Sequence, residues 1–338
     1  MTQHWIKNPK TDSLFILLPP IAVSILTLLF QNQCIKWGNH YNMLTWIVII
    51  IGIDVAHVYA TLFKTYCHSN NFKKNKKLLT LTPLFSLLIS VLLFVFASRY
   101  FWSIMAYIAV FHFVKQQYGF MRLYARHEIK TPLAVVSDKI IIYAATLYPM
   151  SFWMMSNNRN FNWFVANEFI HYQNPALAQI LKISYYIIIT YYTLYIIYNY
   201  ITKNQFNLPK IILIYSTILS WYLAIVHFNN DFIFTVLNVI SHGIPYISLI
   251  YINEIASKTL SQKNFPALLQ SKFIWFITFL LFLAFSEEFL WDILVWQEHL
   301  SISFNANALH FITVPLLTVP QLTHYILDGF IWKKNYAN

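Results

Sequence analysis

Long apolar runs, each about the length of a membrane-spanning helix, alternate with short polar segments along the whole chain. A helix needs about 20 mostly apolar residues to cross the hydrocarbon core of a bilayer. Ten runs approach this length, and they predict an all-α, polytopic transmembrane helix bundle that forms a single domain over residues 1–338. The predicted spans are 14–31, 43–63, 78–98, 100–121, 133–155, 176–201, 209–228, 231–252, 271–290 and 305–332.

The positions of the charged residues predict the orientation of this bundle. Most of the 23 lysines and arginines fall near the two termini and in the loops that follow the even-numbered spans. The positive-inside rule assigns that side to the cytoplasm. The acidic run from Glu287 to Glu298 falls on the opposite side, where the chain could also lie along the interface. We therefore expect ten spans with both termini in the cytoplasm, in a bacterial inner membrane.

Composition excludes several classes of protein. Hydrophobic residues make up 58% and charged residues 10% of the chain, whereas a soluble domain carries roughly a quarter charged residues. The net charge of +11 fits loops that face anionic lipid, so we expect no nucleic-acid partner.

Cys34 and Cys67 are predicted on opposite faces of the membrane, which argues against a disulfide between them. Two cysteines are also too few for a cysteine-based zinc site. The polar N-terminus shows no signal-peptide cleavage site, and we expect none to be cut.

Four even-numbered spans carry histidines inside their apolar runs. Ionisable side chains in a spanning segment cost about 2.5–3.5 kcal/mol each on insertion scales, so they call for a function. The second span carries Asp54 and His57, the fourth His112, the eighth Asn238 and His242, and the tenth Gln321, His324 and Asp328. Counting back from the nearest charged residues places all four imidazoles roughly 10–18 Å from the cytoplasmic boundary. They can meet in one layer if their helices are neighbours.

This set of residues predicts a metal site. Neutral imidazole suits iron, copper and zinc, and carboxylates favour harder ions. We expect His57, His112, His242 and His324 as ligands, with Asp54 and Asp328 either ligating or orienting the histidines. Pro245, shortly after His242, denies its helix one hydrogen bond and leaves a carbonyl free near the site. One or two non-haem iron ions are the predicted cofactor, with haem or zinc as alternatives.

Two further residues, Lys115 and Gln116, follow His112 by about one helical turn and are the candidate catalytic residues. A cation beside a metal is unfavourable, so Lys115 is expected to pair with an aspartate or to bind an anionic group of the substrate. His227 and His310 raise the question of a second site near the outer face. We interpret Tyr246 and Tyr325 as core or interfacial aromatics. An intramembrane histidine can also simply hydrogen-bond a neighbouring helix and hold the bundle together.

The dispersed histidines, together with the segment AVFHFVKQQYG around His112, resemble the integral membrane carotenoid-cleaving dioxygenases of the Brp/Blh type. The resemblance implies a polytopic protein whose helix histidines, His112 among them, ligate iron, and which cuts a polyene with oxygen. The sequence lacks the clustered HxxxH and HxxHH boxes of membrane desaturases and hydroxylases. It also lacks the paired adjacent histidines of a haem–copper oxidase subunit.

The leading functional hypothesis is therefore a membrane enzyme that oxidises a lipophilic substrate with oxygen at a non-haem iron site. Its partners would be the bilayer, oxygen, a hydrophobic membrane-soluble substrate and an unidentified electron donor if one is needed. A proton- or ion-coupled transporter is the first alternative, with Asp54, His57, Lys115, His324 and Asp328 as the relay. A haem b electron carrier and a lipid-modifying transferase with a histidine as general base are further alternatives.

Overall fold

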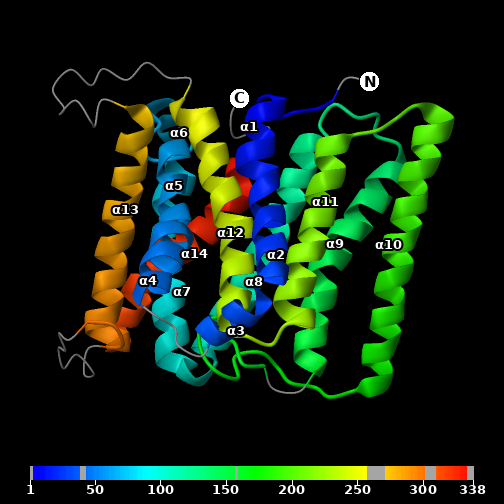
Figure 1. Cartoon of the computed structure of the whole chain (residues 1–338). Helices are drawn as coiled ribbons and strands as arrows, with labels where there is room; N and C mark the ends of the chain where they lie inside the picture. Colours follow the sequence, from blue (N-terminus) through cyan, green and yellow to red (C-terminus); the bar gives the residue numbers. More distant parts are fainter. Residues whose placement is uncertain (1–2, 39–42, 157–158, 257–270, 301–309, 333–338) are drawn as a thin grey trace. The chain divides into compact units, whose positions relative to one another are not determined.

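The computed structural model describes residues 3–38, 43–156, 159–256, 271–300 and 310–332, and every regular element within these ranges is a helix (Figure 1). The prediction of an all-α protein is thus confirmed. Within these described ranges, eight helices are long and apolar enough to cross a membrane, which indicates a multi-pass membrane protein. They are Pro9–Leu29, Met43–Lys64, Lys76–Phe96, Pro132–Met155, Pro175–Lys203, Leu208–His227, Asp231–Ile255 and Lys272–Trp296.

The two remaining predicted spans correspond to α8 (Ser98–Tyr124) and α14 (His310–Ile331). Both are long helices, but they are not among the eight that qualify as spans by length and composition. In α8, polar residues such as Lys115 and Gln116 interrupt the apolar run. In α14 the helix begins at His310, and residues 305–309 of the predicted span lie outside the described residues. The count of ten spans and the orientation of the termini stay predictions.

The chain divides into two compact units, and the division falls inside two helices. The first unit contains residues 1–41 and 113–245, and the second contains residues 42–112 and 246–338. The boundaries lie within α8 and within α12 (Asp231–Ile250), so each of these helices contributes residues to both units.

In the first unit, α9 (Pro132–Met155) packs against α10 (Pro175–Lys203) and α11 (Leu208–Trp221) (Figure 1). Each of these helices has a proline in its first turn, where the missing N–H costs no hydrogen bond. A polar side chain caps each start, and the caps are Thr131, Asn174 and Asn207. The unit also holds α1 (Pro9–Asp12), η1 (Ser13–Leu17), α2 (Leu18–Leu29), α3 (Gln31–Gly38) and η3 (Tyr222–His227).

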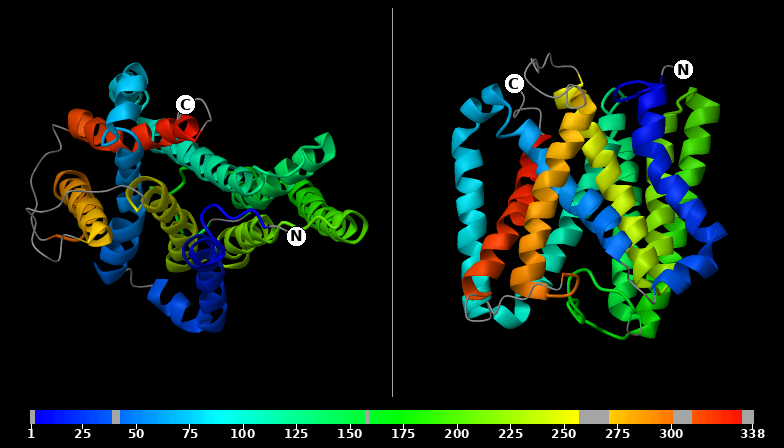
Figure 2. Two further views of the ribbon diagram at one scale, coloured as in Figure 1. Left: turned by 90° about the horizontal axis from the view of Figure 1, so that it is seen from above. Right: turned by 60° about the vertical axis from the view of Figure 1, so that its left-hand side comes forward.

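In the second unit, α14 packs along α7 (Lys76–Phe96) (Figure 2). Small hydroxyl side chains lie between the two helices, with Thr318 Oγ1 3.2 Å from Ser90 Oγ and Thr323 Oγ1 3.2 Å from Ser86 Oγ. Small residues let helices approach closely in a membrane, where the hydrophobic effect does not drive them together. The other elements are α4 (Met43–Thr45), η2 (Trp46–Val55), α5 (Ala56–Lys64), α6 (Ser69–Lys74), η4 (Tyr251–Ile255), α13 (Lys272–Trp291) and η6 (Asp292–Trp296).

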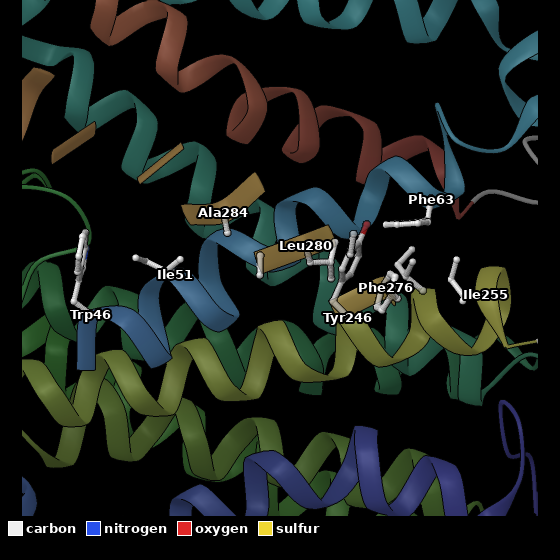
Figure 3. Close-up of a cluster of buried hydrophobic side chains, with 11 residues drawn as sticks. Trp46, Ile51, Phe63, Tyr246, Ile255, Phe276, Leu280 and Ala284 are labelled. Carbon is white, nitrogen blue, oxygen red and sulfur yellow. The ribbon is translucent and has the colours of Figure 1, made fainter. Parts of the chain in front are cut away.

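A buried hydrophobic cluster joins α5 and η2 to α13 in this unit (Figure 3). Phe63 lies edge-on to Phe276, with ring centroids 4.9 Å apart, and Leu280 and Ala284 continue the packing along α13. Tyr246, from the part of α12 that belongs to this unit, is 1% exposed in the same cluster. The cluster thus fixes α5 and Tyr246, which border the site described next.

Candidate metal centre

Three of the predicted histidines lie together inside the second unit. His57 comes from α5, His112 from the part of α8 that belongs to this unit, and His324 from α14. Their side chains are nearly inaccessible, with 2–3% exposure. Each offers a ring nitrogen as a ligand atom, and these atoms lie within 4.8 Å of one another. His57 and His112 thus lie together with His324, which follows each of them by more than two hundred residues.

The contact between His112 and His324 fits a shared metal ion. Their Nε2 atoms lie 3.2 Å apart, and the ring centroids are 4.6 Å apart. Two imidazole nitrogens that bind one ion at about 2.1 Å, in tetrahedral or octahedral geometry, lie about 3.0–3.4 Å from each other. In the metal-free protein the same distance allows one ring to donate a hydrogen bond to the other. The spacing of these two nitrogens therefore matches that of two ligands of one ion.

The Nδ1 atom of each of these histidines has an oxygen atom beside it. Thr61 Oγ1 lies 2.7 Å from Nδ1 of His324. Asp328 Oδ2 lies 3.7 Å from Nδ1 of His112, and Asp54 Oδ1 lies 3.6 Å from Nδ1 of His57. Metal-binding histidines typically direct one ring nitrogen to such an oxygen, which fixes the tautomer and leaves the other nitrogen for the ion.

The two aspartates flank the histidine group. Asp328 shares α14 with His324, but its carboxylate faces His112 on another helix. Its second oxygen, Oδ1, accepts a hydrogen bond of 2.6 Å from Trp332 Nε1. Asp54 lies beside His57, as the spacing of three residues predicted. These positions favour the orienting role over direct ligation.

Sequence reasoning missed Thr61 and read Tyr246 only as a core or interfacial aromatic. Thr61 Oγ1 lies 2.9 Å from the Tyr246 hydroxyl, so the threonine bridges Tyr246 and His324. The Tyr246 ring packs edge-on against the rings of His57 and His324, at centroid distances of 6.0 and 5.3 Å. One signal was present, since Thr61 follows His57 by four residues and lies on the same face of α5. Tyr325 is also close, with its ring stacked 4.7 Å from His112.

The remaining predicted site residues, His242, Lys115 and Gln116, lie in the first unit. His242 is 1% exposed, and its ring stacks on Phe113 at a centroid distance of 3.6 Å. Gln116 Nε2 donates a hydrogen bond of 3.0 Å to the His242 carbonyl oxygen. The carbonyl that Pro245 leaves without its helical donor is that of Ser241, four residues earlier. Lys115 is exposed, and its Nζ donates a hydrogen bond of 3.2 Å to the Tyr143 hydroxyl. The catalytic roles of Lys115 and Gln116 stay predictions.

The histidines considered for a second site have other contacts. His310 Nε2 lies 2.9 Å from the Leu294 carbonyl oxygen, a hydrogen bond that favours a structural role. The His227 ring lies against Phe228. His299 stacks on Trp46 at a centroid distance of 4.2 Å.

Comparison with protein-family models, with curated proteins and with solved structures finds no match for this chain. The class of protein therefore rests on the fold and the site alone. It is a multi-pass membrane protein with four buried histidines, His57, His112, His242 and His324, that could hold a metal ion.

Proposed function

We propose that this protein is a membrane-embedded enzyme that uses non-haem iron and oxygen to oxidise a lipophilic substrate. The observation that carries the proposal is the group of three buried histidines in the second unit, whose ring nitrogens lie within 4.8 Å of one another. A cluster of neutral imidazoles with nearby carboxylates suits a transition metal. Three histidine ligands leave further positions on an iron ion for oxygen or substrate.

Helix geometry supports His242 as a fourth ligand. His242 precedes Tyr246 by four residues in α12, so both side chains lie on the same face of one continuous helix. Tyr246 packs against His57 and His324 in the second unit. We infer that His242 belongs to the same metal site, one helical turn before Tyr246.

The residues around the histidines would prepare the site for the ion. The Thr61 hydroxyl lies at hydrogen-bond distance from Nδ1 of His324 and would hold Nε2 of that ring toward the shared position. The carboxylates of Asp54 and Asp328 lie on the Nδ1 side of His57 and His112, respectively. Tyr246 and Tyr325 are buried aromatics that exclude water from the histidine rings. When bound, iron would supply the activation of oxygen.

Burial of the site favours oxidation over hydrolysis. The histidine side chains are at most 3% exposed and come from helices of a membrane protein. Oxygen and a lipophilic substrate both dissolve in the hydrocarbon core, whereas a hydrolase needs water at the reacting atom. The carotenoid-like class suggested by the segment around His112 is one example of such a substrate.

Labelling with isotopic oxygen tests the proposal. Membranes that contain the protein, loaded with iron, would be incubated under ¹⁸O₂, and the extracted lipids analysed by mass spectrometry. We expect ¹⁸O in a lipophilic product with the wild type and with His171→Ala, an exposed histidine that serves as the matched control. His112→Ala should give none. Iron-loaded wild-type protein that gives no labelled product, or gives label only from H₂¹⁸O, would contradict the proposal.

A further inference from the structure

A cavity of about 290 Å³ with a mixed polar and apolar lining lies in the first unit, between the loop before α9, the last turns of α10 and the start of α11. Its wall passes from exposed loop residues, such as His127 and Gln205, to the buried side chains of Asn199 and Lys210. The N-terminal segment adds His4 to the wall. The volume is near the lower end of the range for small-molecule sites, about 300–1,000 Å³.

An ion group of buried Lys210, buried Asp138 and partly exposed Glu128 forms the inner part of this region. Lys210 Nζ lies 2.8 Å from Glu128 Oε2 and 2.9 Å from Asp138 Oδ2. The Tyr192 hydroxyl donates a hydrogen bond of 2.8 Å to Asp138 Oδ1, and Asn207 Nδ2 donates one of 2.7 Å to Glu128 Oε1. Two carboxylates thus face one ammonium group, which leaves a formal excess of one negative charge.

The other positively charged side chains on the surrounding elements lie at the surface, outside the Glu128–Asp138–Lys210 group. Arg126, Lys130, Lys139 and Lys203 are exposed. The Arg126 guanidinium donates hydrogen bonds to the Leu123 and Trp5 carbonyl oxygens and to the His127 ring. Because Glu128 is only partly exposed, the excess negative charge is incompletely solvated, and the region favours one additional positive group.

An independent observation points to a ligand with N–H donors. Asn199 lines the cavity and is 7% exposed, and its Oδ1 has no hydrogen-bond partner among the described residues. Its Nδ2 donates to the Tyr195 carbonyl at 2.9 Å. A buried oxygen without a donor costs about 1–3 kcal/mol. The Tyr192 and Tyr195 side chains also line the cavity, and aromatic faces attract cations.

We propose that this cavity binds a small organic molecule through its primary ammonium group. An N–H of the ammonium donates to Asn199 Oδ1, and its positive charge balances the second carboxylate of the Glu128–Asp138–Lys210 group. This site is independent of the histidine group and of the reaction proposed for it.

A matched series of four-carbon molecules tests the charge requirement on the detergent-purified full chain. Butylammonium, butanol and butyrate have similar size and carry a positive, no and a negative charge. We expect calorimetry or ligand-observed NMR to show saturable binding of butylammonium, with Kd of about 1 mM or tighter, and no binding of the other two. Equal binding of butanol, or no binding of butylammonium to folded protein, would overturn the proposal and leave water as the occupant.

Two variants locate the binding in the cavity. Asn199→Leu removes the unpartnered acceptor at similar size, and Glu128→Gln removes one negative charge. Each should weaken butylammonium binding by about tenfold or more, because hydrogen bonds to charged groups are strong. Thr202→Val, an exposed position on α10, is the matched control and should bind like the wild type. Unchanged binding in both folded cavity variants would contradict the site, and if neither folds, the wild-type series still decides.

Discussion

At the residue scale, the three histidines differ in the oxygen atom that lies nearest to each Nδ1 atom. The Thr61 hydroxyl lies at hydrogen-bond distance from Nδ1 of His324, whereas the carboxylates of Asp54 and Asp328 lie 3.6 Å from Nδ1 of His57 and 3.7 Å from Nδ1 of His112. A hydroxyl is a weaker partner than a carboxylate, but at 2.7 Å it lies closer to its nitrogen than either carboxylate does. Thr61 is therefore the residue whose loss should disturb ligand orientation without removing charge.

Thr61→Val removes this hydroxyl and keeps the shape of the side chain. We expect metal affinity to fall about 10- to 100-fold, the usual effect of losing a partner that orients a ligand. Thr61→Ser keeps the hydroxyl and should bind metal within about threefold of the wild type. Competition with a chelator measures both affinities. Equal affinity in Thr61→Val and the wild type would show that the hydroxyl does not orient His324 for metal binding.

The sequence indicated the histidines but not all of their partners. Depth in the apolar runs depends only on counting residues, so the layer of His57, His112 and His324 could be predicted. The pairing of Asp328 with His112 could not, because it depends on which helices are neighbours. Hydropathy gives no information on neighbours.

At the element scale, the π-helical segment η2 directly precedes α5, the helix that bears His57. It runs from Trp46 to Val55, so Asp54 lies in its last turn and His57 in the first turn of α5. Such segments are uncommon and often occur at functional sites. The apolar run predicted a span here, but it contains no signal that distinguishes a π-helix from an α-helix. Gly52 lies inside η2, and a Cβ atom there would be 3.2 Å from the Ile47 carbonyl oxygen.

Two glycine-to-alanine changes test whether η2 is tightly packed. Gly52→Ala should lower Tm, because the added methyl group meets a backbone atom held within the same segment. Gly329→Ala in α14 is the matched control, since a Cβ atom there meets nothing within 4 Å. It should raise Tm, because alanine favours a helix over glycine by about 1 kcal/mol. Thermal unfolding in detergent measures both, and a higher Tm for Gly52→Ala would show that η2 relaxes easily.

At the scale of the whole molecule, the lysine distribution predicts which side of the membrane each loop faces. The part of the chain that the structure describes supports a multi-pass protein with eight qualifying helices. The number of membrane crossings depends on whether α8 and α14 also span the membrane. Their polar residues, including His112 and Asp328, lower the hydropathy of the helices that carry the chemistry. A count of spans based on hydropathy alone therefore leaves out two of the helices that carry the histidines.

Labelling of the exposed Cys67 tests the predicted orientation. Cys67 lies in the turn after α5, on the side predicted to be cytoplasmic, whereas Cys34 is buried. Partial burial raises the pKa of the Cys67 thiol, so labelling is best done at mildly alkaline pH. A membrane-impermeant maleimide should label Cys67 in inside-out vesicles and leave it unlabelled in right-side-out vesicles. The opposite result would invert the topology, and Cys67→Ser identifies the labelled residue.

The metal content of detergent-purified protein tests the central claim most directly. Elemental mass spectrometry of the wild type and of His171→Ala should give close to stoichiometric iron, with no Soret band in the absorption spectrum. His57→Ala and His324→Ala should retain less than about a tenth of that iron, because each removes a predicted ligand. Folded wild-type protein without any transition metal would contradict the account and favour a proton relay through these histidines. Full metal retention in both histidine variants would contradict the site.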